Sequence, residues 1–355
     1  LNDGYGAITI GSVETHISEE GFKKGLKPKF SQNKIGKKVA IIGAGPAGLS
    51  AATFLLREGI DVEIFDKQAR AGGLLTYGIP GFKLDKHIIT RRVKLLEEAG
   101  AVFHQNTEVG KDITFDELTN SFDAVFIGVG ATRGRRSGLN GEESDNVYQA
   151  MDFLTTIQKM LFNEPTERII DLKDKNVVVI GGGDTAMDCV RSSIREKAKS
   201  VKCLYRRDAH NMPGSRKEYV NAKEEGAEFE FYVSPKALIT NDKGEVLGIE
   251  MAKTKLGEPD SSGRKRVEEI AGSAYAEEAD VVIFALGFDP MEYPFLASNG
   301  IETDKWGGII VDENYETTTP GIYAGGDCHR GADLVVTAVY DGREAAKAIT
   351  GKLLA

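Results

Sequence analysis

The apolar positions near the start of the chain follow the order strand, turn, helix, strand. Residues 39–42 form a short apolar run typical of a buried strand, and a glycine turn begins at Gly43. A helical pattern then continues to about Glu58, and a second apolar run, residues 62–65, ends at Asp66. Short apolar runs joined by a helical pattern are typical of strands in a parallel sheet. The pattern therefore predicts a β-α-β unit.

The same order returns in the middle of the chain. Strands are predicted at 177–180 and 201–205, and between them lie a glycine turn that begins at Gly181 and a helix that ends near Lys197. One such unit forms part of a dinucleotide-binding domain. Its repetition therefore predicts two nucleotide-binding domains in one chain.

Each unit has a matching strand further along the chain. Residues 123–134 and 279–290 both contain an acidic residue, an apolar strand and a turn of small residues. Turns of small residues allow the backbone to approach a ligand closely. Residues 228–256 alternate between apolar and polar positions, which predicts antiparallel strands with a hairpin at 241–244. We expect this segment to decorate the second domain.

A third pattern of strand, turn and helix ends the chain. A strand ends at Gly325-Gly326-Asp327, and a helix of about fifteen residues is predicted from near Leu334. Flavoproteins with two dinucleotide-binding domains end in this way, so we expect this segment to complete the first domain. The predicted fold class is α/β, a flavoprotein with two Rossmann-like domains. The predicted order is a linker (1–36), a first dinucleotide-binding domain that is split (37–150 and 291–355) and a second one (151–290) inserted within it.

Size and charge limit the class of protein. The chain has 355 residues, of which 41% are hydrophobic, and this size suits about two domains. The net charge of -9 argues against general affinity for nucleic acids, which requires a basic face. No run reaches the length of a membrane span, and the first residues lack the basic start and apolar middle of a secretory signal. We expect a soluble cytoplasmic protein that binds neither membranes nor nucleic acid.

The cysteines and histidines give no metal-binding pattern. Cys189, Cys203 and Cys328 lie far apart and form no C-x-x-C motif, so we expect reduced, structural thiols. An iron-sulfur cluster usually requires four cysteine ligands, so this chain alone is not expected to hold one. The five histidines lack the spacing of metal ligands, and no metal site is predicted.

The first glycine turn has the features of a dinucleotide site. Gly43 permits the tight bend, Gly45 allows the pyrophosphate to approach the backbone, and Gly48 lets the helix pack against the strand. The N-terminus of that helix offers free N–H groups to the phosphates. Asp66 lies 18 residues after Gly48 and can accept hydrogen bonds from ribose hydroxyls.

The second turn has glycine at the first two positions and Ala186 at the third, and it lacks the acidic residue. Gly181 and Gly183 correspond to the first two glycines, and Arg206 and Arg207 stand at the strand end where the first unit has Asp66. A carboxylate would repel an adenosine 2′-phosphate, whereas guanidinium groups bind it through paired hydrogen bonds. The substitution therefore favours NADP(H) over NAD(H) and predicts that the inserted domain (151–290) is an NADPH-binding domain. The ending typical of flavoproteins, together with Asp66, predicts that the split domain (37–150 and 291–355) is an FAD-binding domain.

With these motifs, the chain resembles the small (β) subunit of NADPH-dependent glutamate synthase and the related flavin domain of dihydropyrimidine dehydrogenase. The resemblance extends over nearly the whole chain and includes GAGPAGLSAA, DKQARAGGLLTYGIPGFKLDK, GGGDTAMDC, YRRDAHNMPGSRKE and AGGDCHRGADLVVTAV. The motifs and the resemblance together predict FAD contacts from Gly43, Gly45, Pro46, Ala47, Gly48, Asp66, Gly72, Gly73, Leu74, Lys83, Val109, Gly130, Gly326, Asp327, Asp333, Leu334 and Val335. They predict NADPH contacts from Gly181, Gly183, Asp184, Thr185, Arg206, Arg207, Arg216 and Gly287.

The resemblance also implies a reaction and a partner. Hydride would pass from NADPH to FAD, and electrons would then pass to the glutamate synthase large subunit or another acceptor, as in glutamate biosynthesis. Family members carry a cysteine-rich N-terminal domain with two iron-sulfur clusters, and residues 7–25 resemble the stretch that follows it. Because the chain starts with Leu1 just after that domain, we expect a fragment or a cluster-free relative.

No catalytic triad is expected, because the cofactors supply the chemistry and the protein positions them. Lys83 is a candidate side chain near the flavin, although a solvent-facing loop lysine is equally compatible with the sequence. A disulfide reductase of the thioredoxin-reductase type is an alternative, but it requires paired cysteines beside the flavin or nicotinamide. A non-catalytic NADP(H)-binding module is a second alternative.

Overall fold

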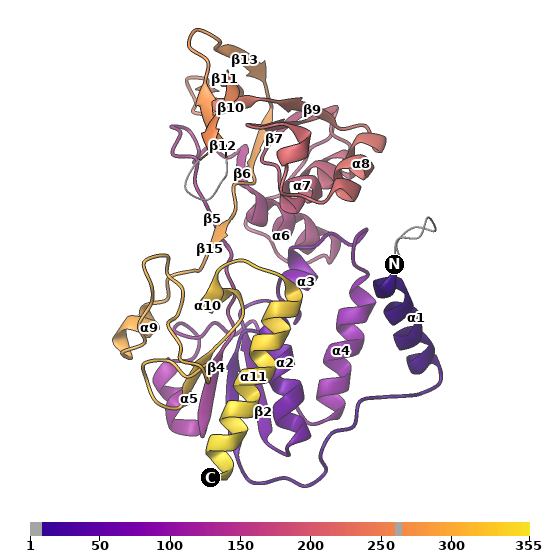
Figure 1. The fold of residues 1–355 in the computed structure, drawn as a ribbon, viewed down its shortest axis with the longest axis vertical. Coiled ribbons are helices and arrows are strands. Elements are labelled where there is room, and N and C mark those ends of the chain that lie inside the picture. Colours follow the sequence, from indigo (N-terminus) through magenta and orange to yellow (C-terminus); the bar gives the residue numbers. More distant parts are fainter. Residues whose placement is uncertain (1–8, 260–264) are drawn as a thin grey trace.

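The computed structural model describes residues 9–259 and 265–355, and two parallel sheets organise this part of the chain into two lobes (Figure 1). The first sheet has the strand order β16-β4-β1-β2-β3, and all of its pairings are parallel. Its strands are β1 (Lys38–Ile42), β2 (Asp61–Asp66), β3 (Val102–Gln105), β4 (Ala124–Ile127) and β16 (Ile322–Ala324). The last strand pairs with β4, so the end of the chain completes the sheet that begins at residue 38.

The second sheet is formed by the middle of the chain and has the order β6-β14-β7-β8-β9, again all parallel. Its strands are β6 (Val147–Gln149), β7 (Asn176–Ile180), β8 (Ser200–Tyr205), β9 (Glu228–Phe231) and β14 (Val281–Phe284). Because β6 belongs to this sheet, the boundary predicted at residue 150 falls just after the first strand of the second lobe.

Helices cover the sheets and bury their apolar faces. In the first lobe α2 (Pro46–Arg57) and α11 (Val335–Leu354) pack against each other over the sheet, and Leu55, Ile64 and Ile349 lie in the same buried cluster. The other helices of this lobe are α3 (Leu74–Tyr77), α4 (Lys86–Glu98), α5 (Phe115–Ser121), α9 (Pro294–Ser298) and α10 (Asp327–Arg330).

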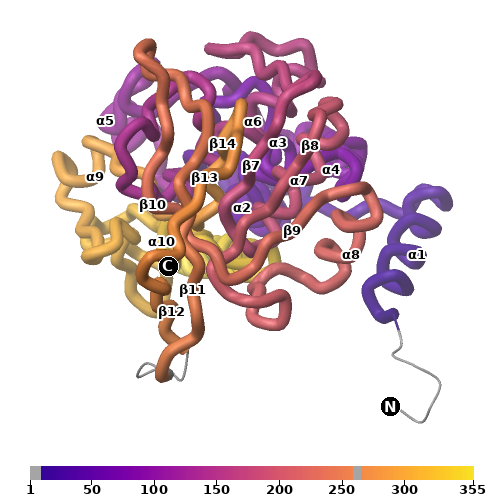
Figure 2. The backbone as a smooth tube through the Cα atoms, turned by 90° about the horizontal axis from the view of Figure 1, so that it is seen from above, coloured from indigo at the N-terminus to yellow at the C-terminus, as the bar shows by residue number. Residues whose placement is uncertain are grey.

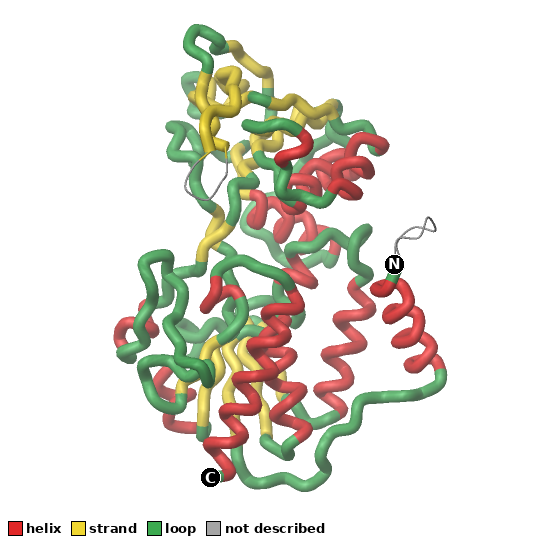
Figure 3. Tube along the Cα trace, in the orientation of Figure 1, coloured by secondary structure: helices red, strands yellow, loops and turns green. Residues whose placement is uncertain are grey.

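The second lobe combines three helices with an antiparallel extension. Its helices are α6 (Ala150–Leu161), α7 (Asp184–Arg195) and α8 (Arg216–Glu224), and a short 3₁₀ turn, η1, covers Ala209–Asn211. The extension contains β10 (Val233–Thr240), β11 (Val246–Pro259), β12 (Lys265–Glu269) and β13 (Tyr275–Glu278). Figure 3 shows these strands at the end of the lobe distant from the first sheet.

A narrow two-stranded ribbon connects the lobes. The chain leaves the first lobe through β5 (Arg133–Gly134) and returns through β15 (Phe288–Asp289). The two strands pair in antiparallel fashion, with Phe288 opposite Gly134 and Asp289 opposite Arg133. Figure 1 shows this ribbon between the two lobes. The chain therefore passes between the lobes twice, each time through this ribbon.

Most predicted elements agree with the structure, with three differences. The hairpin at 241–244 is confirmed, because β10 and β11 pair in antiparallel fashion around it. The antiparallel prediction is wrong for residues 228–231, since β9 pairs with β8 in parallel. The last helix has 20 residues instead of about fifteen.

The third difference lies in the segment that was predicted to be a linker. It contains the helix α1 (Ile10–Lys23), which buries none of its residues and lies at the edge of the molecule (Figure 2). The helix is held by polar contacts: the Arg91 guanidinium binds both carboxylate oxygens of Glu19 and stacks over the Phe22 ring at 4.0 Å. Because these contacts involve distant residues, the local apolar pattern does not indicate the helix.

No helix in the described ranges has both the length and the apolar character needed to cross a membrane.

Candidate functional site

A cavity of about 1180 Å³ lies between the lobes and is lined by residues of both. Its lining follows the carboxyl ends of the first sheet, where β1, β2, β4 and β16 are succeeded by Gly43, Lys67, Gly128 and Gly325. From the second lobe it includes residues of α6 together with Thr185 and Asp188 of α7. Ligands of open α/β sheets bind at this edge of the strands.

The first glycine turn forms a close-packed cradle at this edge. Gly43 has φ +101°, and a Cβ there would lie 2.5 Å from the Gly128 carbonyl oxygen. A Cβ on Gly48 would lie 2.0 Å from the Gly43 oxygen, so only glycine lets α2 approach the strand. Gly45 precedes the first turn of α2, and Pro46 occupies its first position. The free N–H groups of this helix end are therefore directed toward the cavity region.

Asp66 connects the end of β2 to the glycine turn. Its Oδ2 accepts a hydrogen bond from the Ala44 amide at 2.7 Å, and its Oδ1 accepts one from the Gln68 amide at 2.8 Å. Burial raises the pKa of this carboxyl, while the two amides oppose the shift. Asp66 also lines the cavity. Each of its carboxylate oxygens has a second lone pair, which can accept a hydrogen bond from a ribose hydroxyl.

The C-terminal motif closes the cavity on the other side. Gly326 has φ +77°, and its amide donates to Asp341 of α11 at 2.9 Å. Asp341 is fully buried, and Arg330 donates to both of its oxygens. Burial raises the pKa of Asp327 to about 6. Leu334 caps the N-terminus of α11, which therefore starts at the cavity wall.

The structure brings most of the predicted FAD residues together. The lining of the cavity includes Gly43, Gly45, Pro46, Ala47, Asp66, Gly73, Leu74, Val109, Gly130, Gly326, Asp327, Asp333, Leu334 and Val335. Gly48 and Gly72 lie behind it: Gly48 packs under the turn, and the Gly72 amide donates to the Ala44 oxygen at 2.8 Å. Lys83 lies outside the lining and forms an ion pair with Asp188 at 2.8 Å.

The predicted NADPH residues gather at the carboxyl ends of three neighbouring strands of the second sheet. Gly181 follows β7, Arg206 and Arg207 follow β8, and Gly287 comes shortly after β14. Gly183, Asp184 and Thr185 form the start of α7, and Arg216 is the first residue of α8. Of this set, Thr185 alone lines the cavity between the lobes.

The second turn is packed as tightly as the first. A Cβ on Gly181 would lie 2.5 Å from the Ala285 oxygen. The loop before α8 folds over the turn, because the Gly214 amide donates to the Gly182 oxygen and the Ser215 amide donates to Asp184, both at 2.9 Å. The turn, α7 and the start of α8 are thus joined.

The two arginines after β8 occupy different environments. Arg206 and Arg216 are exposed, whereas the Arg207 residue is 7% exposed and donates to the Lys265 carbonyl at 3.1 Å. The Thr254 hydroxyl donates to the Arg206 carbonyl, and the Tyr232 amide donates to the Arg207 carbonyl, so the backbone of this turn is held in place. Arg206 is therefore the one of the pair that is directed to solvent at the strand end.

The cysteines are separate from the cavity. Cys189, Cys203 and Cys328 all fall within the described ranges, where they are free and buried. Burial raises the pKa of each thiol. No member of the trio lines the cavity, which is the place where a disulfide reductase needs a reactive pair. In the same ranges, no group of three or more His, Cys, Asp or Glu residues is arranged to hold a metal ion.

Sequence reasoning missed the residues of the second lobe that face the cavity and the buried acid of α11. Asp188 lines the cavity from α7, and burial raises the pKa of its carboxyl to about 6. Met151, Thr155 and Lys159 of α6 line it as well. Their positions depend on how the lobes meet, for which the sequence holds no local signal. Asp341 could have been noticed as an acidic residue among apolar positions of the last helix.

Comparisons with known proteins agree with this architecture. The family described as pyridine nucleotide-disulphide oxidoreductase matches residues 37–342. The chain is 50% identical to the glutamate synthase (NADPH) small chain of Escherichia coli K12, over 98% of this chain and 76% of that protein. It is 51% identical to the putative oxidoreductase AegA of the same organism, over 98% of this chain and 54% of AegA, so it spans about half of that relative.

Solved structures with the same fold include FprA from Mycobacterium tuberculosis in complex with NADPH and thioredoxin reductase from T. acidophilum. FprA has a TM-score of 0.76 at 20% identity, covering 89% of this chain and 84% of FprA. The thioredoxin reductase has a TM-score of 0.65 at 22% identity, covering 90% of this chain and 100% of the reductase. The chain thus belongs to the pyridine nucleotide-disulphide oxidoreductase family, with homologues among the glutamate synthase small chains.

Proposed function

We propose that this chain is an NADPH-dependent flavin oxidoreductase that binds FAD in the cavity between the lobes and passes electrons to a partner. The observation that carries the proposal is that both lobes contribute residues to the same cavity. Most of the residues predicted to contact FAD line one cavity, and Thr185 and Asp188, from the lobe with the second glycine turn, line the same cavity.

The residues at the cavity fit FAD. A pyrophosphate requires a backbone surface without side chains, and Gly43 and Gly45 provide it at the N-terminus of α2. Asp66 lines the cavity and would accept hydrogen bonds from a ribose, and the volume of about 1180 Å³ is at the large end of ligand sites, as a dinucleotide needs. When bound, FAD would supply the hydride acceptor and NADPH the hydride.

The first lobe would also favour negative charge at one end of the cavity. The N-terminus of the 20-residue helix α11 begins at Leu334 and Val335, which line the cavity. A helix N-terminus carries a partial positive charge that stabilises a nearby anion. Asp341 fixes this end of the helix to the turn at Gly326. These residues would hold a reduced, anionic ring in a prepared environment.

The second lobe would bind NADPH at the carboxyl edge of its sheet. Gly181 and Gly183 would face the pyrophosphate, and the exposed Arg206 and Arg216 would bind the 2′-phosphate. Arg207 would support this turn from the buried side through Lys265. The relatives named glutamate synthase (NADPH) small chain support this choice of nucleotide.

The partner would be an electron acceptor such as a glutamate synthase large subunit, reached through an iron-sulfur domain, and the protein would act in the cytoplasm. The relatives named glutamate synthase (NADPH) small chain support a large subunit as the partner. A disulfide reductase is disfavoured, because the three cysteines are buried away from the cavity.

Reconstitution with FAD followed by anaerobic titration tests the proposal. The purified chain should take up FAD, and NADPH should bleach the visible flavin absorbance while NADH does so only at much higher concentration. A chain that binds NADPH but takes up no FAD would instead be a non-catalytic NADP(H)-binding module, and the proposal would fail.

A further inference from the structure

A short loop of the first lobe reaches across to the second lobe. Residues 78–85 follow α3, and the Phe82 ring stacks under two guanidinium groups of α7, those of Arg191 at 4.5 Å and Arg195 at 3.9 Å. Both distances lie within the range of cation–π attraction. Arg191 and Arg195 are four positions apart, so they extend from one face of the helix.

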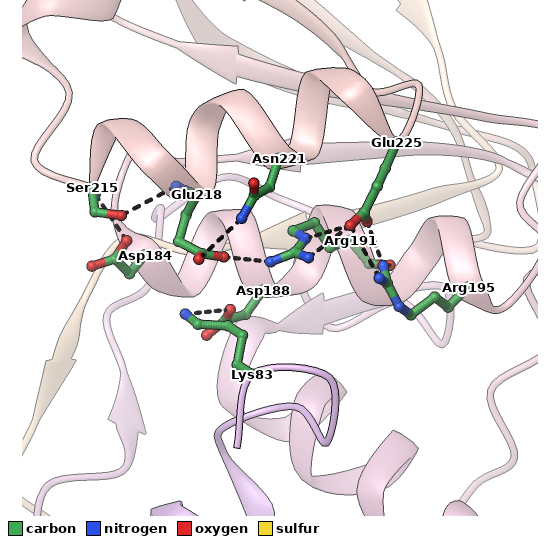
Figure 4. Close-up of polar contacts among 9 residues, drawn as sticks. All are labelled: Lys83, Asp184, Asp188, Arg191, Arg195, Ser215, Glu218, Asn221 and Glu225. Atoms are coloured by element: carbon green, nitrogen blue, oxygen red, sulfur yellow. Dashed lines mark hydrogen bonds and ion pairs between the residues drawn. The ribbon is translucent and has the colours of Figure 1, made fainter. Parts of the chain in front are cut away.

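Glutamates at α8 and directly after it bind the two arginines (Figure 4). Arg191 donates to Glu218 at 2.5 Å and to Glu225 at 2.7 Å and 3.0 Å, and Arg195 also donates to Glu225. The Arg191 side chain is 9% exposed, and the carboxylates compensate its charge. Phe82 therefore meets a rigid, preorganised surface.

A second contact of the same loop reaches the cavity. Lys83 and Asp188 form an ion pair at 2.8 Å, and their side chains are 22% and 8% exposed (Figure 4). Asp188 belongs to the cavity lining and lies one turn of α7 away from Thr185. The loop thus holds the same helix face at two adjacent points.

The base of the loop is fixed to the cavity wall. The Lys86 ammonium donates to the carbonyls of Leu75, at 2.8 Å, and of Ile79. Leu75 and Ile79 both line the cavity. A continuous chain of contacts therefore runs from the cavity wall through the loop to α7 and to the glycine turn at its start.

This loop adds to two other connections between the lobes, of which the first is the ribbon. The ribbon of β5 and β15 has two residues in each strand, and such connections readily permit rotation of one domain relative to the other. The second is a set of contacts to α6 and the segment after it: α3 packs against α6, and Arg70 and Tyr77 bind Glu164. These contacts are made to α6 and Glu164, whereas the loop contacts α7 directly.

We infer that Phe82 and Lys83 form a latch that sets the orientation of α7, and with it the second glycine turn, relative to the cavity. Both are positioning residues for hydride transfer, a role that rests on the proposed function. A donor and an acceptor must approach within about 3–3.5 Å, and a displacement of 1 Å can cost about 100-fold in rate. The latch would thus hold the second lobe, which would carry the hydride donor NADPH, at the correct distance from the flavin.

The orientation can be measured without any cofactor. Nitroxide labels on Lys94→Cys of α4 and Glu224→Cys of α8 occupy exposed positions in the two lobes, and the native cysteines are buried. The full chain should give one narrow distance distribution by pulsed electron spin resonance. Phe82→Leu should broaden or shift it, and Phe82→Tyr, which keeps a ring, should restore it. Lys83→Met tests the ion pair in the same way.

The FAD-loaded variants provide the second readout. The rate of flavin reduction by saturating NADPH should fall about tenfold or more in Phe82→Leu, while the NADP⁺ dissociation constant changes little. An unchanged distance distribution in both Phe82→Leu and Lys83→Met would overturn the inference, and so would an unchanged rate in a variant with a broadened distribution. If no form takes up FAD, the proposed function fails, and the distance measurement alone decides whether the latch exists.

Discussion

Gly43 and Gly45 stand two positions apart in one turn but are required for different reasons. Gly43 has φ +101°, and any Cβ there would collide with the Gly128 oxygen at 2.5 Å. Gly45 has ordinary backbone angles, and a Cβ there would lie 4.0 Å from the same oxygen. The first glycine is therefore a requirement of the fold, and the second is a requirement of the proposed ligand.

This difference predicts opposite outcomes for two matched variants. Gly43→Ala should lower the free energy of unfolding by about 2 kcal/mol or more, because a strained backbone and a clash add together. Gly45→Ala should unfold like the wild type without FAD but lose most of its affinity for FAD. Urea unfolding and flavin titration measure both effects. Equal FAD affinity in Gly45→Ala and wild type would contradict the assignment of the cradle.

Arg206 and Arg207 differ in the same way, although they are adjacent. Arg206→Ala should weaken NADPH binding by about 10-fold to 100-fold, because a charge-assisted contact contributes roughly 1.5–3 kcal/mol, and should leave NADH binding unchanged. Arg207→Met, at the buried position, should mainly change the unfolding midpoint. Isothermal titration with both nucleotides separates the cases. Equal losses for NADPH and NADH in Arg206→Ala would refute the 2′-phosphate assignment.

Asp188 predicts a pH dependence of stability with a definite sign. Burial raises its pKa from 3.8 to about 6, so the folded state binds this proton more tightly than the unfolded chain does. Stability from this group therefore decreases as the pH rises from about 4 to about 6. The loss is on the order of 3 kcal/mol, and Asp188→Asn should lack it.

Glu225 provides the control with the opposite sign. Hydrogen bonds from Arg195 and Arg191 lower the pKa of Glu225 to about 2, so its contribution is present above about pH 4.5 and is lost as the pH falls. Glu225→Gln should therefore reduce the loss of stability in acid. Urea midpoints between pH 3 and pH 7 test both variants. Parallel pH profiles for wild type and Asp188→Asn would contradict the effect of burial.

At the scale of elements, α2 and α11 depend on one close approach. A Cβ on Gly342 would lie 2.1 Å from the Ala47 oxygen, whereas a Cβ on Gly351 of the same helix meets nothing within 4 Å. Gly342→Ala should therefore cost about 2 kcal/mol or more through overpacking, and Gly351→Ala should be neutral or stabilise the helix by about 0.5 kcal/mol. Chemical denaturation gives both values. Equal effects would show that the two helices do not need this contact.

The elements also show how far the sequence alone is informative. The strands and helices that flank each glycine turn are predicted within two residues, because apolar runs and glycine positions are local signals. The helix α1 and the parallel pairing of β9 are missed, since both depend on distant partners, Arg91 for α1 and β8 for β9. Local alternation does not show which strand a segment will meet.

For the candidate site, motif residues are predictable and lobe contacts are not. The glycine turns and the end of β16 place their residues at the carboxyl edges of the two sheets, as parallel topology requires. Asp188 lines the cavity, and Phe82 lies against α7, only because the lobes meet in one orientation. No spacing in the sequence encodes that orientation, and the buried state of Arg207 is equally invisible without the antiparallel extension.

At the scale of the whole molecule, the proposed function requires the ligands of the two sheets to meet at the cavity between the lobes. The first sheet is closed by a strand from the end of the chain, and the ribbon of β5 and β15 provides both crossings to the second. In the account proposed above, the ribbon would let the second lobe rotate while the first glycine turn stays intact, and the loop at Phe82 would set its position. The proposed function would therefore depend on the orientation of the two lobes as much as on either binding site.

Anaerobic titration of the FAD-reconstituted chain with NADPH and NADH in parallel tests the central claim most directly. The account predicts that the chain takes up FAD, that about one equivalent of NADPH bleaches the flavin, and that NADH requires a far higher concentration. A chain that takes up no FAD, or a flavin that both nucleotides reduce equally well, would contradict it.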